Sequence, residues 1–527
     1  MAAPYPCRFA AIPVYSMAAA PNSWAIMNRR SFIASAATGA FSTAAARGAE
    51  RRPTSTSAQA AASAGVRAAS DAPNILWICT DQQRWDTIRA LGNSHIRTPN
   101  IDRLCAEGVA FTHAHCQNPI CTPSRASFLT GMYPRYLNAC TNGNERWQNE
   151  APLVTKTLAD AGYDCGLAGK FHLTSAHGRI EPRLDDGYRV FHWSHHPHDS
   201  WPQGHDYNDW LKARGIDHTA TKKRLGYIPT EHHQTTWCAD RAIDFMREQR
   251  EGPWLFSYNC FDPHPPLDPP KEFLDRFDLE SLPLPAFAES DLAEERGLAG
   301  VNFQSKAGRI PEKKQRLNLA KYWAMIELID QNVGRMIEAL EATGQRDNTV
   351  IIFTSDHGHM IGDHGLNNKG CRFYDGLVRV PLIWSCPKRF ETNLRSDALV
   401  ELTDIAPTLL ELAGLEVPES MHGRSLKPIL TGAADAGEHR EFVRCTFSET
   451  LRGPRSFGTM IRNRRHKLCT YHGTGLGQLF DLEADPNEHR NLWDDPGHAS
   501  IKAELMLASF DAEAMSADVG SRRVGRY

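Results

Sequence analysis

Cys121 stands in the part of the chain whose residue types most clearly suggest chemistry. Pro123 suits the first turn of a helix, and Arg125 follows one turn along it. Because a helix N-terminus presents backbone N–H donors, a thiol at that point lies in an electropositive environment. These residues favour a reactive thiolate at Cys121, and a structural cysteine is the alternative.

Four predicted strands lead into polar residues. They are short, wholly apolar runs at 74–80, 163–168, 254–260 and 350–354. The residues that follow them are Asp81 and Gln82; Lys170 and His172; Asp262 and His264; and Asp356 and His357. Ligands of open α/β sheets bind beyond the carboxyl ends of the strands. Taken singly such residues are common turn formers, but four strands ending this way indicate a functional site at one sheet edge.

Four of these side chains form a candidate metal site. Asp81, Gln82, Asp356 and His357 offer mostly oxygen donors with one imidazole, a set that suits a hard divalent cation. We expect one Ca²⁺. Because an imidazole is atypical for calcium, Mn²⁺ and Mg²⁺ stay open, and a metal-free hydrogen-bonded cluster is the alternative.

Residues 121–131, CTPSRASFLTG, resemble the sulfatase signature C-x-P-S-R-x-S-x-L-T-G at every specified position. Further segments agree with the family in the same order: 73–76 with Asp81 and Gln82, 169–172, 263–265, 355–358, Lys369 with 379–383, and 479–492. The resemblance covers residue 73 to about residue 515. It implies an alkaline-phosphatase-like fold, and oxidation of Cys121 to formylglycine by a formylglycine-generating machinery before export.

The resemblance also implies roles for the polar residues. Hydrated formylglycine at position 121 would attack sulfur and carry the sulfate covalently. Three cations would neutralise charge on the sulfate: Arg125, Lys170 and Lys369. We expect His264 to protonate the leaving oxygen and His172 to deprotonate the second hydroxyl. His232 is a candidate substrate-binding residue, with a structural role as the alternative.

Three positions depart from the family pattern. Gln82 stands where many sulfatases have Asp, His357 where many have Asn, and Asp375 where Glu is frequent. The first two resemble the choline-sulfatase and phosphonate-monoester-hydrolase branches. The predicted function is therefore hydrolysis of sulfate esters, with a phosphonate monoester or phosphodiester hydrolase on the same site as the alternative. A catalytically inactive glycan-binding relative is disfavoured, because nucleophile, metal ligands and cations are all present.

The substrate is expected to be a small-molecule or oligosaccharide sulfate ester, most naturally a sulfated carbohydrate. The pocket walls would come from segments 173–235 and 265–320, whose polar and aromatic residues suit an anionic glycan; examples are His195, His196, Trp201 and Arg224.

The pattern of apolar runs predicts the elements that position these residues. Apolar strands, including one at 380–385, alternate with amphipathic helices at 101–107, 153–161, 236–249, 319–342 and 404–412. The predicted fold is α/β: a large domain at 71–435 with a mixed, mostly parallel sheet covered by helices. A smaller α+β subdomain at 436–527 would hold an antiparallel sheet and a final helix.

Composition limits the other possibilities. The 527 residues carry a net charge of −3, so no global field favours nucleic acid, and no apolar run approaches the roughly 20 residues of a spanning helix. Thirteen cysteines without a CxxC pair argue against a disulfide framework or a zinc cluster of that type. Residues 1–70 are predicted to be an export leader and disordered linker. The pair Arg29-Arg30 resembles a twin-arginine signal, which would place the protein in the periplasm or outside the cell.

Overall fold

The computed structural model describes residues 67–149, 151–197, 204–448 and 454–517, which belong to one compact unit, Ser63–Tyr527. The predicted twin-arginine segment and Trp201 lie outside the described residues. Within these ranges, no helix combines the length and apolar character that crossing a membrane requires. Every cysteine in them is a free thiol, and all but Cys140 are buried.

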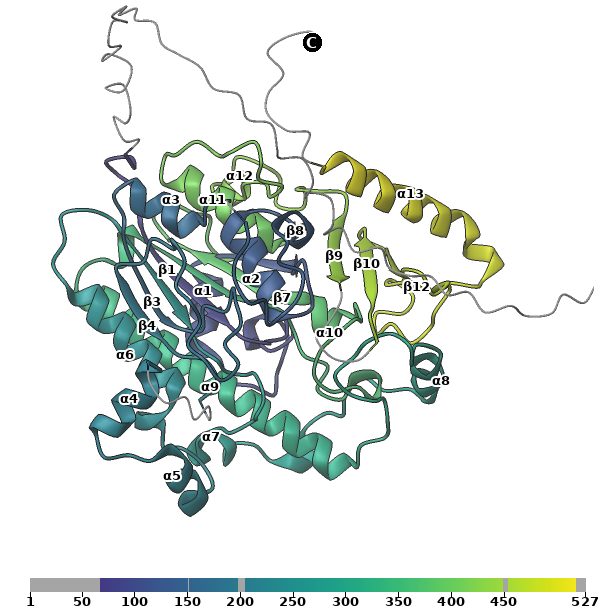
Figure 1. Cartoon of the computed structure of the whole chain (residues 1–527), viewed down its shortest axis with the longest axis horizontal. Helices are drawn as coiled ribbons and strands as arrows, with labels where there is room; N and C mark the ends of the chain where they lie inside the picture. Colours follow the sequence, from purple (N-terminus) through teal and green to yellow (C-terminus); the bar gives the residue numbers. More distant parts are fainter. Residues whose placement is uncertain (1–66, 150, 198–203, 449–453, 518–527) are drawn as a thin grey trace, which may run out of the picture. The chain divides into compact units, whose positions relative to one another are not determined.

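An eight-stranded sheet runs through the larger part of the unit, with strand order β4-β3-β5-β1-β6-β7-β2-β8 (Figure 1). The strands are β1 (Asn74–Thr80), β2 (Gly108–His115), β3 (Asp164–Gly169), β4 (Val190–Trp193), β5 (Trp254–Asn259), β6 (Thr349–Ser355), β7 (Arg379–Ser385) and β8 (Leu394–Glu401). Only β7 runs antiparallel to its neighbours, β6 and β2. The predicted mixed, mostly parallel sheet is confirmed.

Three strands of this sheet were not predicted. β4 and β8 are the two outermost strands, so they are partly exposed and lack a continuous apolar run. β2 lies next to β8, and its register shifts near Thr112 and His113, where two half-buried polar residues interrupt the run. The pattern of apolar runs therefore finds the central strands and misses strands at both ends of the sheet.

Helices cover both faces of the sheet, and successive side chains of β1 point into two different hydrophobic cores. Leu76 and Ile78 pack in a core with α1 (Pro99–Ala106), α6 (Gln234–Arg247) and α9 (Glu312–Ala342). Ile75 and Trp77 pack in the opposite core with α2 (Cys121–Thr130), α3 (Val154–Asp160) and α11 (Ile405–Leu412). Figure 1 shows the two groups on opposite sides of the strands. α9 begins seven residues before its predicted start, because its first turn is polar and exposed.

Shorter elements decorate this core. The remaining α-helices of the larger part are α4 (Asp206–Ala213), α5 (His218–Leu225), α7 (Lys271–Leu274), α8 (Glu289–Gly297), α10 (Asp375–Val378) and α12 (Lys427–Leu430). Of these, α7 and α8 lie in the segment between β5 and α9. Single 3₁₀ turns lie at η1 (Arg89–Leu91), η2 (Pro134–Leu137), η3 (Thr230–His232), η4 (Leu279–Ser281), η5 (Arg346–Asn348), η6 (Asp363–Gly365), η7 (Leu402–Asp404) and η8 (Pro496–His498).

A separate four-stranded antiparallel sheet follows, in the order β12-β11-β10-β9. Its strands are β9 (Val443–Ser448), β10 (Phe457–Arg462), β11 (His466–Tyr471) and β12 (Leu476–Asp481), and α13 (Ala499–Met515) packs on it. Asp375, one of the departures from the family pattern, joins this sheet to the larger one. Its carboxylate pairs with Arg462 at 2.9 Å and with buried Lys467 at 2.5 Å, so its role is structural.

Candidate active site

Asp81 and Asp356 are adjacent because β1 and β6 pair in parallel. The register sets Thr80 beside Ser355, the last residue of each strand, so the following residues reach the same sheet edge. Both carboxylates are fully buried. Asp356 Oδ1 accepts a hydrogen bond from the backbone N–H of Gln82 at 3.0 Å.

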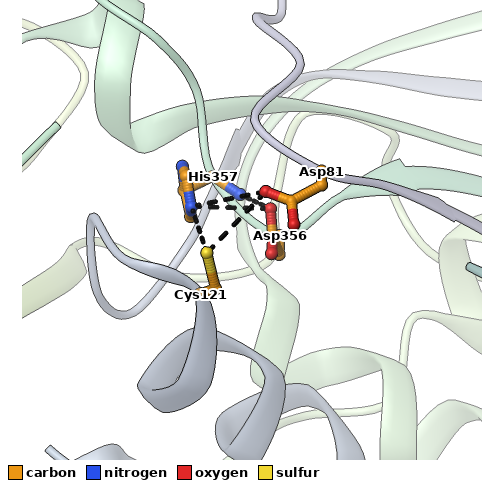
Figure 2. Close-up of side chains that lie close together, drawn as sticks. All are labelled: Asp81, Cys121, Asp356 and His357. Atoms are coloured by element: carbon orange, nitrogen blue, oxygen red, sulfur yellow. Dashed lines mark hydrogen bonds and ion pairs between the residues drawn. The ribbon is translucent and has the colours of Figure 1, made fainter. Parts of the chain in front are cut away.

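Cys121 reaches this edge from a different direction. β2 ends there, and α2 begins at Cys121 after a short loop, which confirms the predicted helix start. The backbone N–H of Thr122 donates to Asn142 Oδ1 at 2.8 Å, which holds the start of the helix. Cys121 Sγ lies 3.3 Å from His357 Nε2 and 3.7 Å from Asp81 Oδ1. Figure 2 shows the side chains of Cys121, Asp81, Asp356 and His357 pointing toward one another.

Two ammonium groups contact the thiol. Lys369 Nζ lies 2.9 Å and Lys170 Nζ 3.4 Å from Cys121 Sγ, and Lys170 also forms an ion pair with Asp81. Burial and the Asp81 carboxylate raise the pKa of Cys121. Lys170, Lys369 and His357 outweigh them, so the pKa lies well below its ordinary value. The site therefore stabilises negative charge at residue 121.

Arg125 is the third cation, and it is fully buried in α2 one turn after the thiol. Its Nε donates to Asp356 Oδ2 at 2.9 Å, and a second nitrogen donates to the backbone oxygen of Lys170 at 2.8 Å. Arg125 thus orients a predicted metal ligand and the loop that carries Lys170. Arg125, Lys170 and Lys369 thus balance the two carboxylates and a negative charge at residue 121.

Three of the four predicted metal ligands, Asp81, Asp356 and His357, gather beside the thiol. His357 Nε2 lies 3.9 Å from Asp81 Oδ1 and 3.7 Å from Asp356 Oδ1. Gln82 has a left-handed backbone, with φ of 69°, and its side-chain amide nitrogen lies 2.8 Å from His359 Nδ1. The amide oxygen of Gln82 is buried and has no hydrogen-bond partner in the described structure. Two carboxylates and an imidazole that converge in this way are a donor set of the kind that binds a cation, and Gln82 as a fourth ligand stays a prediction.

His172 lies at the end of the β3 loop, in a backbone conformation that few non-glycine residues adopt, with φ of 61°. Buried Glu181 holds this turn, because its carboxylate accepts backbone N–H groups at 2.5–2.9 Å from residues 172, 173 and 174. The ring of His172 packs edge-on against His195. Burial and the charge of Lys170 lower the pKa of His172 to about 4, so the imidazole is neutral at pH 7.

The other two predicted histidines differ in their surroundings. His264 is half-buried, packs on Phe261, and has its Nδ1 2.7 Å from the Pro265 carbonyl oxygen. Burial and Lys369 hold its pKa well below the ordinary value, and Asp81 opposes them. His232 packs against Trp210 instead and is not among the residues that line the cavity at the site. Its proposed contact with substrate stays a prediction.

A cavity of about 670 Å³ opens beside Cys121, and His172 lines it. Its other walls come from several segments: Ile120, Asn142, Gly143, Ser175, Ala176, His177, His195, His196, Asn302, Gln304, Gly370 and Phe447. Phe447 belongs to β9, so the small sheet contributes to the wall. Arg224, expected in this wall, is exposed on α5 and does not line the cavity.

Sequence reasoning missed several of these residues. Glu181, His359 and Asn142 hold site residues in place. His359 and Asn142 are distant in sequence from the residues they hold, and Glu181, seven to nine residues away, belongs to no recognisable motif. Asn302 and Gln304 follow α8 in a region without apolar periodicity. A buried carboxylate such as Glu181 can be found only once the fold shows which N–H groups converge on it.

Comparisons with known proteins agree with this geometry. Residues 73–415 match the family model described as sulfatase, and residues 362–512 match the one described as N-sulphoglucosamine sulphohydrolase, C-terminal. The chain is 32% identical over 444 residues to an arylsulfatase of Clostridium perfringens, covering 80% of this chain and 90% of that protein. It is 27% identical over 499 residues to an N-acetylglucosamine-6-O-sulfatase of Bacteroides thetaiotaomicron, covering 82% and 85%.

A solved structure shows the same fold. The phosphonate monoester hydrolase of Agrobacterium radiobacter superposes with a TM-score of 0.72 at 27% identity, covering 85% of this chain and 96% of that one. The alkaline-phosphatase-like fold expected from the sequence is thereby confirmed. With the family model spanning most of the described residues and the signature cysteine at the centre of the site, the chain belongs to the sulfatase family and is a sulfuric ester hydrolase.

Proposed function

We propose that this enzyme hydrolyses the sulfate ester of a sulfated carbohydrate, with formylglycine at position 121 and one Ca²⁺. One observation carries the proposal. Residue 121 begins α2, the ammonium groups of Lys170 and Lys369 contact its side chain, and the donor atoms of Asp81 and His357 lie beside it. A nucleophile, charge neutralisation and a cation site thus meet at one atom.

The spacing of the donors supports calcium over magnesium. His357 Nε2 lies 3.9 Å from Asp81 Oδ1 and 3.7 Å from Asp356 Oδ1. Octahedral ligands of Ca²⁺, at about 2.4 Å from the ion, would be about 3.4 Å apart, whereas those of Mg²⁺ would be about 2.9 Å apart. The wider spacing suits the larger ion.

The bound groups and the protein side chains would divide the work. Hydrated formylglycine would supply a hydroxyl nucleophile at the position of Cys121 Sγ. The bound cation would lower the pKa of this hydroxyl and neutralise charge on the sulfate. Lys170 and Lys369 would bind the sulfate oxygens as the charge shifts toward the leaving oxygen. These positions need no movement of the backbone, because both ammonium groups already contact residue 121.

The two histidines fit opposite proton transfers. A pKa of about 4 leaves His172 neutral and able to accept a proton. His264 is neutral in the substrate-free site, and an anionic sulfate beside it would raise its pKa, as a general acid requires. We therefore propose His172 as the base that releases sulfate and His264 as the acid that protonates the leaving alcohol.

The cavity supports a carbohydrate as the alcohol. Its walls present imidazole and amide groups, from His195, His196, Asn302 and Gln304, with Phe447 as an apolar surface. Polar hydrogen-bonding groups beside an aromatic ring suit a hydroxylated ring substrate. One of the relatives above is an N-acetylglucosamine-6-O-sulfatase.

We also propose export through the twin-arginine pair, to be tested by cell fractionation of wild type against a variant with both Arg29 and Arg30 replaced by Lys.

Phosphonate or phosphodiester hydrolysis is the second candidate. Gln82 and His357 resemble that branch, and a phosphonate monoester hydrolase shares the fold at 27% identity. The test compares p-nitrophenyl sulfate, p-nitrophenyl phenylphosphonate and bis(p-nitrophenyl) phosphate, which release the same alcohol. A panel of sulfated monosaccharides, with Cys121→Ala as background, is run beside them. We expect the highest kcat/KM on a sulfated sugar; preference for either phosphorus ester over every sulfate would overturn the proposal.

A further inference from the structure

A second cluster of metal-ligand side chains lies outside the active site. Asp291 of α8, His364 of η6 and His489, in the loop after β12, come together from three distant segments. We refer to these three residues as the bridging cluster. Asp291 and His364 are buried, and His489 is about one-quarter exposed.

The distances in the bridging cluster resemble those between ligands of one ion. His489 Nδ1 lies 3.0 Å and His364 Nδ1 3.4 Å from the same oxygen, Asp291 Oδ1. Tetrahedral ligands about 2.0–2.1 Å from Zn²⁺ are about 3.3 Å apart. The Nδ1 atom of His364 is buried and makes no hydrogen bond of normal geometry in the described structure. A donor that is buried in this way is costly unless something binds it.

Contacts outside the cluster fix two of its three ligands. The other carboxylate oxygen of Asp291 accepts the backbone N–H of Ala288 at 2.8 Å, which leaves Oδ1 for the histidines. The ring of His364 stacks on Tyr374, with centroids 3.8 Å apart and planes 11° apart. Such outer contacts orient ligands and strengthen metal binding.

The surroundings favour a cation with an open coordination position. Beside Asp291, the carboxylates of Asp363 and Glu488 also act on His364 and favour positive charge at the cluster. Because His489 is partly exposed, solvent can reach the cluster and water can complete the coordination. Two imidazoles and one carboxylate are nitrogen-rich, so they suit Zn²⁺ and not Ca²⁺, the reverse of the active-site donors.

We propose that the bridging cluster binds Zn²⁺ through His364 Nδ1, His489 Nδ1 and Asp291 Oδ1, with water as the fourth ligand. The ion would join α8, the loop between His357 and Lys369, and the segment after the small sheet. Its role is to stabilise this junction, and it does not depend on the substrate proposed above.

The test uses the full-length enzyme in excess Ca²⁺, so that the active-site donors are occupied. Zn²⁺ is titrated calorimetrically into wild type and into His489→Gln, with His498→Gln as a matched control. His498 is another partly exposed histidine, 3.2 Å from an aspartate, but it has no third ligand. We expect one Zn²⁺ site in wild type and His498→Gln. Loss of one ligand should weaken binding by more than about tenfold in His489→Gln.

Spectroscopy and thermal unfolding give a second test. Co²⁺ bound to wild type should show the strong visible absorption of a tetrahedral site, and zinc X-ray absorption should show two imidazole ligands. Zn²⁺ should also raise the Tm of wild type and not that of His489→Gln. Equal zinc binding by wild type and His489→Gln, or no zinc binding by wild type, would overturn the proposal.

Discussion

Replacement of Glu181 by Gln should slow catalysis although Glu181 touches no reacting atom. Its two oxygens accept four hydrogen bonds, from the backbone N–H groups of residues 172–174 and, at 3.3 Å, from Trp193 Nε1. Each oxygen accepts two of them. A glutamine turns one oxygen into an NH₂ group, so two bonds are lost and donors face donors.

The magnitude follows from these contacts. Hydrogen bonds to a charged group contribute about 1.5–3 kcal/mol each, so the loss of two costs about 3–6 kcal/mol. Burial raises the pKa of Glu181, so removing its charge returns part of this cost. We expect the free energy of unfolding to fall by about 2–4 kcal/mol. The turn of His172 would relax, and a displacement of about 1 Å in a catalytic group lowers the rate by roughly 10²-fold.

The assay measures kcat and urea unfolding for Glu181→Gln and for a matched control, Asp330→Asn. Asp330 is also a buried carboxylate that accepts backbone N–H groups, from Asn100 and Ile101, but it lies in α9 against α1. We expect Glu181→Gln to lose both stability and kcat, and Asp330→Asn to keep its kcat. A Glu181→Gln enzyme with unchanged kcat would refute the reasoning that this carboxylate positions His172.

Three further predictions follow from the same structure. Chelation should lower activity and Tm together, because the ion would be held by residues that follow two different strands and would lower the pKa of the nucleophile; elemental analysis and recovery with Ca²⁺ check this, and full activity in metal-free enzyme would contradict it. His172→Ala should release a burst of alcohol and then sulfate roughly 10²–10⁴-fold more slowly, as rapid-quench assays of the two products would show; unchanged turnover would exclude His172 as the base. Burial raises the pKa of Asp330 to about 7, against about 3.9 in the unfolded chain. The stabilisation that this carboxyl group contributes to the fold is therefore complete below pH 4 and is lost as the pH rises through 7. Urea unfolding should therefore show wild type losing about 4 kcal/mol relative to Asp330→Asn over that range, and parallel curves would contradict this.

Much of the sheet could be predicted because its central strands are buried on both faces. β1 matches the predicted run 74–80 at both ends. The edge strands β4 and β8 could not be found in this way, because one side of each is open to solvent and their residues are mixed. Local patterns report burial, and burial decreases toward the edge of a sheet.

The site shows a similar division. Residues that follow central strands, such as Asp81, Lys170 and Asp356, are brought together as expected, because parallel strands end at the same edge. Lys369 reaches Cys121 through a loop, and only the family resemblance indicated it. The supporting residues Glu181 and His359 depend on loop conformations such as the left-handed turns at 82 and 172, which no local pattern specifies.

The proposed mechanism depends most on the chemical state of residue 121. Mass spectrometry of the tryptic peptide from enzyme made with and without a formylglycine-generating enzyme, with activity measured on each sample, tests it directly. We predict that the rate is proportional to the fraction carrying the aldehyde, 18 Da below the cysteine form, and that Cys121→Ala is folded and inactive. Full activity in a sample that contains only the free thiol would contradict the proposed nucleophile.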